Sequence, residues 1–310
     1  KDKNSLKKFP LKTYLCLDCH LVQIKDYLKG DDLFLQNYAY LSGVSKTWHE
    51  HCFKFVNFCI KHLNLKKNDK VLEIASNDGT LLKYFLNKNY NVLGIEPTLS
   101  TASISKKNGI KTITKFFGYK QSINIKKKYG NFRLIIANNV VAHVDDVNDF
   151  FKGLNFLCDD KTIISIEFQY VLNLIKNNQF DTIYHEHFSY YSLISFKNLI
   201  DKFNFKIFDV KKIPTHGGSL RVFMCKNHNK IKISQNYYSI LLNEKKIGID
   251  KLKFYLSFQK RINLLRINFR KFIFNNKKKK KSIYAYGAAA KGNTFLNFMN
   301  LNDRHIKFIM

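Results

Sequence analysis

The densest group of chemically active side chains is the run Tyr184-His185-Glu186-His187, which joins a phenol, two imidazoles and a carboxylate. One residue separates the two histidines, so the H-E-x-x-H spacing of helical zinc sites is absent. In a loop or strand, His185 and His187 share one face and Glu186 takes the other. A histidine near its ordinary pKa beside a carboxylate suits general acid and base work. The run predicts an acid–base site, with a metal site or a structural hydrogen-bond cluster as the alternatives.

A second candidate site surrounds the stretch Val71–Thr80, VLEIASNDGT. Its pattern predicts a short buried strand that carries Glu73, then a turn of small and polar residues, then a helix. This arrangement forms the nucleotide cradle of open α/β sheets. A second strand, Asn91–Ile95, ends in Glu96 and Pro97, where a carboxylate can accept hydrogen bonds from a ribose. The two acids at strand ends predict an adenosine-type ligand, and NAD is the weaker candidate because the turn is not G-x-G-x-x-G.

Polar residues also follow later elements of the predicted sheet. Asn138, Asn139 and His143 come after the strand 132–137, at the edge where a parallel sheet holds its ligands. The turn 214–221 contains His216, a Gly-Gly pair and Arg221, whose guanidinium could pair with a phosphate or a surface carboxylate. The stretch 282–298 predicts a strand at 283–286, a small-residue loop with Lys291 and a helix, which is a candidate anion cradle or simply tight packing.

Among the six cysteines only Cys16 and Cys19 have motif spacing. Two thiolates in C-x-x-C form half of a tetrahedral zinc site, and free thiols in a loop are the alternative. We expect the missing ligands upstream of Lys1 and a continuation beyond Met310. Cys52 and Cys59 fall on a helical pattern and are expected in the core. The segment 34–49 has no clean period, so a loop that reaches a site and a packed linker are equally compatible with it.

Strands at 71–74, 91–95, 111–118, 132–137 and 162–168 alternate with helices and precede a final pair at 205–210 and 219–225. This order predicts an α/β fold with a Rossmann-like sheet. Long amphipathic helices are expected over 230–276, and the basic run Lys277–Lys281 marks a boundary.

The 310 residues carry a net charge of +30. Nucleic acid is the usual partner of so basic a chain. The basic residues, mostly lysines, are spread over the whole length, however, and a basic surface also attracts an anionic small substrate. No apolar run approaches the roughly 18 residues of a membrane helix, and residues 1–10 do not resemble a signal peptide. We therefore expect a cytoplasmic enzyme that binds neither nucleic acid nor membrane.

Nine motifs occur together and in order: FPLKTYLCLDCHLVQ, NYAYLSGVSKTWHEH, VLEIASNDGTLL, LGIEP, FFG, NNVVAHV, FDTIYHEHFSYYSL, PTHGGSLRVF and YAYGAAAKGNTFLN. In these the chain resembles the sugar C-methyltransferases, which are class I S-adenosylmethionine-dependent enzymes with an N-terminal zinc-binding domain. The resemblance implies a nucleotide-linked keto-deoxysugar as substrate. It also implies three parts: 1–61, a partial zinc-binding arm and linker helix; 62–228, a domain that binds S-adenosylmethionine; and 229–310, a partial helical and Rossmann-like domain that helps to hold the substrate. It implies that proton abstraction next to the keto group gives an enolate, which attacks the donor methyl group in line.

The resemblance also assigns roles to residues. His187 or Glu186 would be the base, and Tyr184, His143 and Tyr38 would contact the enolate and the substrate. The donor would contact Glu73, Ala75, Ser76, Asn77, Asp78, Gly79, Glu96, Pro97, Phe116, Phe117, Asn138 and Asn139. The substrate would contact His185, His216, Arg221, Tyr286, Lys291 and Asn293, and Cys16 and Cys19 would bind zinc. We expect a monomer. A basic zinc-containing nucleic-acid-binding protein and an inactive methyltransferase-like fragment remain as alternatives.

Overall fold

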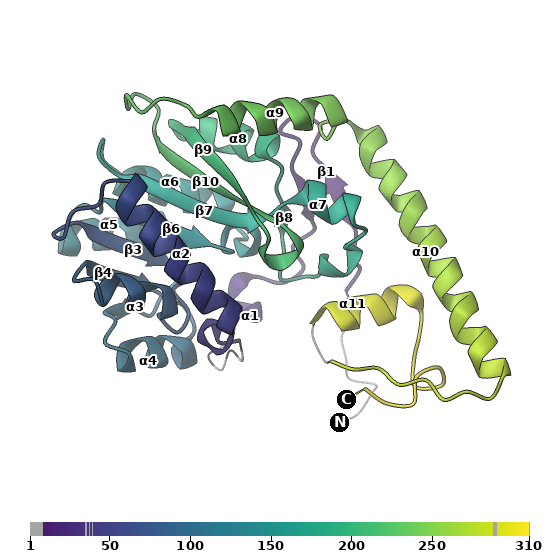
Figure 1. Ribbon diagram of the computed structural model, residues 1–310. Helices are drawn as coiled ribbons and strands as arrows, with labels where there is room; N and C mark the ends of the chain where they lie inside the picture. The colour runs from purple at the N-terminus through teal and green to yellow at the C-terminus, as the bar shows by residue number, and fades with distance from the viewer. Residues whose placement is uncertain (1–8, 35, 37, 39, 288–289, 310) are drawn as a thin grey trace.

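The computed structural model describes residues 9–34, 36, 38, 40–287 and 290–309. Within these residues, seven strands form one sheet in the order β5-β4-β3-β6-β7-β10-β9 (Figure 1). Neighbouring strands from β5 to β7 run parallel, and β10 is antiparallel to both β7 and β9. The predicted Rossmann-like α/β fold is thereby confirmed. The strands are β3 (Lys70–Ile74), β4 (Asn91–Ile95), β5 (Thr112–Ile113), β6 (Leu134–Asn138), β7 (Ile163–Gln169), β9 (Phe205–Ile213) and β10 (Ser219–Lys226).

The third strand is shorter than the sequence predicted. Only Thr112 and Ile113 pair with β4, at the edge of the sheet, whereas the prediction covered 111–118. The chain then leaves the edge, so Phe116 and Phe117 lie beyond the strand.

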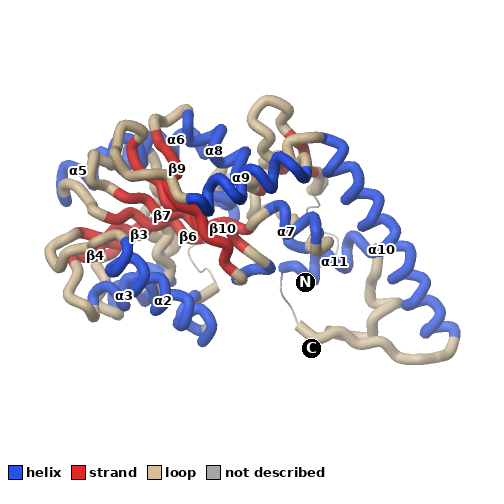
Figure 2. The backbone as a smooth tube through the Cα atoms, turned by 45° about the horizontal axis from the view of Figure 1, so that its top comes forward, coloured by secondary structure: helices blue, strands red, loops and turns tan. Residues whose placement is uncertain are grey.

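Helices cover both faces of the sheet, as the crossover connections of parallel strands require (Figure 2). One apolar core joins a face of the sheet to the first helices, with Phe55, Leu82 and Phe85 fully buried. The other core lies against the later helices and contains Phe151 and Phe196. The helices are α2 (Lys46–His62), α3 (Thr80–Leu86), α4 (Leu99–Lys107), α5 (Tyr119–Tyr129), α6 (Val147–Leu157), α7 (Val171–Lys176) and α8 (Leu193–Asp201).

The N-terminal arm is a small hairpin joined to the main body. Strand β1 (Thr13–Leu15) pairs with β2 (Val22–Ile24), and β2 pairs with β8 (Ser189–Tyr190). Because β8 follows the Tyr184–His187 run directly, this pairing fixes the arm beside that run. The short helix α1 (Gly30–Leu33) and the segment after it lead from the arm to α2.

The C-terminal part is helical. Helix α9 (Gln235–Ile247) packs on β9, and α10 (Leu252–Lys278) then extends away from the sheet before the chain returns through α11 (Ala290–Met299) (Figure 1). The expected strand at 283–286 is not formed, and an isolated bridge joins Ala285 to Ile309 instead. A two-stranded pairing without further neighbours is marginal, which accounts for the difference. None of the helices in the described ranges combines the length and apolar character needed to cross a membrane.

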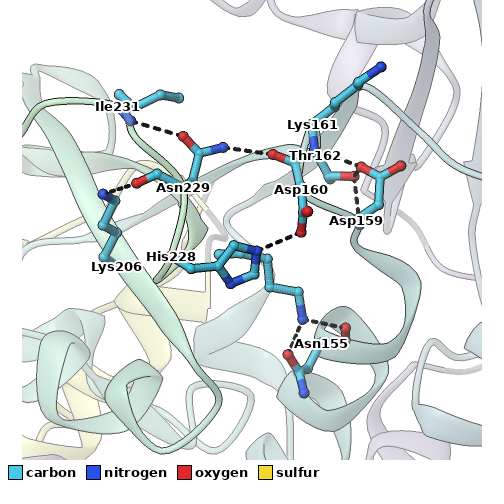
Figure 3. Close-up of polar contacts among 10 residues, drawn as sticks. Asn155, Asp159, Asp160, Lys161, Thr162, Lys206, His228, Asn229 and Ile231 are labelled. Carbon is cyan, nitrogen blue, oxygen red and sulfur yellow. Dashed lines mark hydrogen bonds and ion pairs between the residues drawn. The ribbon is translucent and has the colours of Figure 1, made fainter.

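Polar contacts fix the end of the sheet at which β7 begins and β10 ends (Figure 3). Lys226 Nζ donates to the backbone oxygen of Asn155 at 2.7 Å. His228 Nε2 lies 2.6 Å from the Asp160 carboxylate, and Asn229 donates to the Asp160 carbonyl at 2.7 Å. The cavity described below lies at the opposite end of the strands.

Glu244 of α9 joins the C-terminal part to the sheet domain. Its side chain is fully buried, and its two carboxylate oxygens accept the N–H groups of Leu193 and Ile194 at 2.7 and 2.8 Å. Those N–H groups belong to the first turn of α8, where no partner exists within the helix. A carboxylate at this position satisfies both groups and interacts favourably with the helix dipole.

We predict that Glu244→Gln lowers the free energy of unfolding by about 1.5–3 kcal/mol, because one buried N–H group loses its charged acceptor. Urea denaturation followed by circular dichroism measures the change. Glu50→Gln, on the exposed side of α2, is the matched control. Equal midpoints for the two variants would contradict the role of Glu244.

Candidate functional site

The carboxyl ends of β3, β4 and β6 border a cavity of about 590 Å³. Strand β4 lies on one side of β3 and β6 on the other, so the order of the sheet reverses here, which is where open α/β sheets bind ligands. Many residues predicted from the sequence line this cavity. They are Tyr38, Glu73, Ala75, Ser76, Asn77, Glu96, Pro97, Phe116, Phe117, Asn138, Asn139, His143, Tyr184, Glu186, His187, His216 and Lys291.

The turn after β3 has an unusual backbone that brings it against β4. Ala75 and Asn77 have positive φ angles of 55° and 49°. Gly79 follows with a φ of 79°, and a Cβ there would lie 2.6 Å from the Ser105 hydroxyl, so this position requires glycine. The shape directs the backbone of Ala75 to Asn77 toward the cavity and directs Gly79 into the protein.

Glu96 is buried at the end of β4 and organises this turn. One carboxylate oxygen accepts the Asn77 N–H at 2.9 Å, and the other accepts the N–H and the hydroxyl of Thr98 at 2.9 and 2.6 Å. A carboxylate has about four acceptor positions. Glu96 therefore retains room for a hydrogen bond from a ligand in the cavity that it lines.

Several buried polar atoms on this wall have no hydrogen-bond partner within the described residues. They are Glu73 Oε2, Ser76 Oγ and both side-chain polar atoms of Asn138. Burial, with Asp78 and Glu96 nearby, raises the pKa of Glu73 well above its ordinary value. Polar groups are costly to bury unless something bonds to them. Their gathering on one wall therefore indicates a polar ligand.

Asp78 was predicted to approach the donor, but its carboxylate is directed away from the cavity. It accepts the hydroxyl of Ser42 at 2.8 Å and the N–H of Gly43 at 2.7 Å, and it also accepts the Thr80 hydroxyl. Neither Asp78 nor Gly79 lines the cavity. Asp78 instead holds the segment around Ser42 against the turn, and Asn77 helps by accepting the Ser42 N–H at 3.0 Å.

His187 lies on the opposite wall with a defined proton arrangement. Its Nδ1 is 2.9 Å from the carbonyl oxygen of Thr182. A carbonyl oxygen can only accept, so Nδ1 carries the proton and Nε2 keeps a free lone pair. Burial lowers the pKa of His187 to about 4, although the bond to Thr182 acts in the other direction. The imidazole is therefore neutral and able to accept a proton.

Aromatic residues pack around His187. Its ring centroid lies 4.6 Å from that of His143 and 4.2 Å from that of Tyr184. Burial and the neighbouring His187 lower the pKa of His143 to about 3, and burial raises the pKa of Tyr184 to about 12. His143 Nδ1 and the hydroxyl of the buried Tyr190 have no partner among the described residues.

Glu186 and Tyr38 complete this wall. Glu186 is partly buried, and burial raises the pKa of its carboxyl group. Burial, followed by the charge of Glu186, also raises the pKa of Tyr38, so its hydroxyl stays protonated and can donate a hydrogen bond. Within the described part of the chain, the Glu186 carboxylate has no hydrogen bond that would orient it as a base, whereas His187 has one.

His216 and Lys291 approach the cavity from two later elements, the turn before β10 and the start of α11. Burial lowers the pKa of His216, while Glu167 raises it and Lys291 lowers it. Lys291 also lowers the pKa of His187. Its cationic side chain therefore acts on both histidines.

Arg221 was predicted to bind the substrate, and the structure assigns it elsewhere. It does not line the cavity, and its guanidinium lies 2.5 Å from the Glu167 carboxylate in a buried ion pair. The sequence left a surface carboxylate as the alternative partner of Arg221. The partner is a carboxylate, but it is buried.

Three other predicted substrate contacts also lie outside the cavity lining. His185 packs against Phe9 and Tyr27 and approaches the Pro10 carbonyl at 3.3 Å. Tyr286 is 91% exposed, and Asn293 accepts hydrogen bonds from Asn297 within α11. The run 184–187 is a turn, closed by the bond from the His187 N–H to the Tyr184 carbonyl at 2.9 Å, so strand alternation does not apply. The expectation that His185 and His187 share a face was therefore wrong, because His187 lines the cavity beside Glu186 and His185 packs against the N-terminal arm.

The sequence left other lining residues unassigned. Trp48 and Tyr40 line the cavity, and the indole N–H of Trp48 is buried without a partner in the described structure. Both belong to the segment 34–49. Its many aromatic residues, without a helical period, were the signal in the sequence that the segment could reach a site. Of this segment, residues 35, 37 and 39 lie outside the described part.

Cys16 and Cys19 lie in the turn between β1 and β2. Hydrogen bonds from the backbone of Cys19 and Asp18 lower the pKa of Cys16, which favours its thiolate, while burial raises the pKa of Cys19. No group of three or more metal-binding side chains is found in the described residues. The two thiols alone do not make up a metal site in the described residues, and zinc binding stays a prediction.

Comparison with known proteins gives consistent matches. The methyltransferase domain family matches residues 46–210, and the C-methyltransferase C-terminal domain family matches residues 214–310. C-methyltransferase NovU of Streptomyces niveus is 30% identical over 300 residues, which cover 97% of this chain and 71% of that protein.

Solved structures show lower similarity. Magnesium protoporphyrin IX methyltransferase from Synechocystis PCC 6803, with bound SAH, is 12% identical with a TM-score of 0.46, over 57% of this chain and 83% of that one. The PH0226 protein from Pyrococcus horikoshii OT3 is 12% identical with a TM-score of 0.48, over 60% and 94% of the two chains.

Proposed function

The chain belongs to the S-adenosylmethionine-dependent C-methyltransferases, and we propose that it methylates a carbon next to the keto group of a nucleotide-linked deoxysugar. The resemblance found in the nine sequence motifs is confirmed, and family membership favours an enzyme over a nucleic-acid-binding protein. One observation supports the proposal most directly. The unpaired polar atoms at the carboxyl ends of β3 and β6 and the free Nε2 of His187 belong to walls of the same cavity.

The donor would bind at the carboxyl ends of β3 and β4. Glu96 would accept a hydrogen bond from the ribose with its remaining capacity, and Glu73, Ser76 and Asn138 would bond the polar groups of the amino-acid end. Phe116, Phe117 and Pro97 would give an apolar surface for the adenine. Bound S-adenosylmethionine supplies an electrophilic methyl group on a sulfonium.

His187 would be the base. Its Nε2 lone pair is free because Nδ1 donates to Thr182, and this bond also fixes the ring. Nε2 would take the proton from the carbon next to the keto group, and the C–H electron pair would move into the enolate. Glu186 remains the alternative base, without a comparable orienting bond in the described structure.

The enolate oxygen would need hydrogen-bond donors. Tyr38 and Tyr184 keep their protons because their pKa values are raised. A buried donor stabilises an anion more than water-exposed groups do. His143, whose Nδ1 lacks a partner in the described residues, would contact the same part of the acceptor.

Lys291 and His216 would contact the anionic nucleotide portion of the substrate. Lys291 brings a positive charge to the cavity from α11, and the net charge of +30 would favour the approach of a diphosphate. We further propose that Cys16 and Cys19 supply two ligands of a structural zinc in the arm, which takes no part in methyl transfer. The cytoplasmic location and the monomeric state also stay predictions.

We predict that Glu96→Ala weakens S-adenosylhomocysteine binding by about 1–3 kcal/mol, because the Asn77 and Thr98 donors lose their acceptor along with the ribose. Isothermal titration calorimetry measures the affinity. Glu50→Ala serves as the exposed control. An unchanged affinity in Glu96→Ala would place the donor elsewhere.

His187→Asn should lower kcat by a factor of about 10²–10⁴, the usual contribution of a general base, while S-adenosylhomocysteine affinity is retained. Steady-state kinetics with a panel of nucleotide-linked keto-deoxysugars provides kcat. His228→Asn, at the far end of the sheet, is the matched control.

The same assay distinguishes the two candidate bases, His187 and Glu186. Glu186→Gln should retain most of kcat if His187 is the base. A large loss in Glu186→Gln together with wild-type kcat in His187→Asn would assign the base to Glu186.

The acidic limb of kcat/KM should reflect the lowered pKa of His187, about 4. Between pH 7 and pH 5.5 kcat/KM should stay nearly constant, whereas with a base of pKa 6.5 it would fall about eightfold.

The same pKa shift affects stability. In the unfolded chain the histidine binds a proton near pH 6.5 and in the folded chain it does not, so the free energy of unfolding falls as the pH drops from about 6.5 toward 4. Circular dichroism at each pH must therefore show a folded enzyme. A limb centred near pH 6.5 in folded enzyme would contradict the prediction.

A further inference from the structure

The turn between β9 and β10 holds three consecutive residues in the left-handed region. His216, Gly217 and Gly218 have φ angles of 54°, 79° and 110°. A Cβ at Gly217 would lie 2.4 Å from Gln179 Nε2, and one at Gly218 would lie 2.0 Å from Asn173 Nδ2. Histidine adopts this region uncommonly, so the surrounding structure must hold the turn in place.

Side chains from neighbouring elements supply that restraint. Gln169 donates to the His216 carbonyl at 3.3 Å, and Gln179 donates to the Gly217 carbonyl at 3.2 Å. The hydroxyl of Thr215 donates to Glu167 Oε1 at 3.0 Å. The first two bonds are long, so the bond to the carboxylate is the strongest of the three restraints.

Glu167 is fully buried in β7, and its other oxygen is engaged as well. Oε2 lies 2.5 Å from the Arg221 guanidinium and 3.1 Å from His51 Nε2. Arg221 in turn stacks over the Phe55 ring at 4.1 Å. Burial alone would raise the pKa of Glu167, but the contact with His51 and the charge of Arg221 hold it at about 2. His51 Nε2 also lies 2.7 Å from the Arg221 guanidinium, so the three side chains form one cluster. The carboxylate is therefore ionised.

Glu167 connects to three parts of the cavity wall. Thr215 precedes His216, His51 stacks on Trp48 with ring centroids 4.9 Å apart, and both His216 and Trp48 line the cavity. The backbone oxygen of Glu167 accepts the N–H of Asn139, another lining residue, at 2.7 Å. A single buried residue thus joins α2, the loop after β6 and the turn before β10.

We propose that Glu167 is a positioning residue for methyl transfer, which acts through Thr215 to hold His216 against the acceptor. The proposal rests on the proposed function, because the acceptor is assigned there. Glu167 lines no part of the cavity, so its effect on the reaction must pass through the groups that it holds.

The variant Thr215→Val removes the hydroxyl and keeps the shape of the side chain. We expect it to lower kcat by about 10- to 100-fold, since displacements of about 1 Å cost rates of this order. S-adenosylhomocysteine affinity should stay within about twofold, because the donor wall is not altered. Thr215→Ser restores the hydroxyl and should recover most of kcat.

A second readout does not depend on turnover. The imidazole signals of His216 in ¹H–¹⁵N NMR spectra, assigned with His216→Gln, should shift in Thr215→Val and return in Thr215→Ser. Ser234→Ala is the matched control, since Ser234 donates to the Asp209 carboxylate at 2.6 Å outside the cavity lining. It should change neither kcat nor the His216 signals.

Unshifted His216 signals in Thr215→Val, or wild-type kcat, would overturn the proposal. Equal losses of kcat and donor affinity without rescue by serine would also overturn it, by showing a structural role only. If the wild-type enzyme methylates no acceptor of the panel, the proposed function fails, while the His216 signals still decide whether Glu167 and Thr215 position that side chain.

Discussion

The antiparallel pairing of β10 with β7 is the constraint on which the site depends. Because β10 begins where β7 ends, the turn before it returns to the carboxyl edge of the parallel strands, where the turn after β3 lies. The register sets Arg221 opposite Glu167 and Ser219 opposite Gln169. A slip of one residue would turn Arg221 to the other face and leave a buried carboxylate without its cation. The register thus determines both the charge balance of the core and the position of His216.

Two local arrangements then shape opposite walls of the cavity, which our proposal assigns to the donor and to the acceptor. On one side, Glu96 satisfies the turn after β3 and still lines the cavity. On the other, Thr182 fixes the tautomer of His187, and the pairing of β2 with β8 anchors the chain directly after it. The N-terminal arm therefore has a physical connection to the proposed base, whether or not it carries zinc.

The sequence predicted the features that repeat or that obey local rules. The buried strands β3, β4, β6 and β7 follow from short apolar runs, and the turn after β3 follows from its small residues, because these patterns are determined within the segment. The strand expected at 283–286 is absent because strand formation needs neighbouring strands, which a local pattern does not reveal.

The directions of the Asp78 and Arg221 side chains were missed for a related reason. Each pairs with a residue far along the chain, Ser42 and Glu167. Trp48 fell on a helical pattern that indicated core packing, and Tyr40 lacked a periodic signal, so only the tertiary structure shows that both reach the cavity.

The central claim is that His187 removes a proton from carbon before the methyl group is transferred. Solvent deuterium exchange at the acceptor carbon, followed by NMR with S-adenosylhomocysteine in place of the methyl donor, isolates that step. The wild-type enzyme and Glu186→Gln should exchange at similar rates, and His187→Asn should exchange slower by about 10²-fold or more. Exchange at the wild-type rate in His187→Asn would contradict the account and assign proton removal to another group.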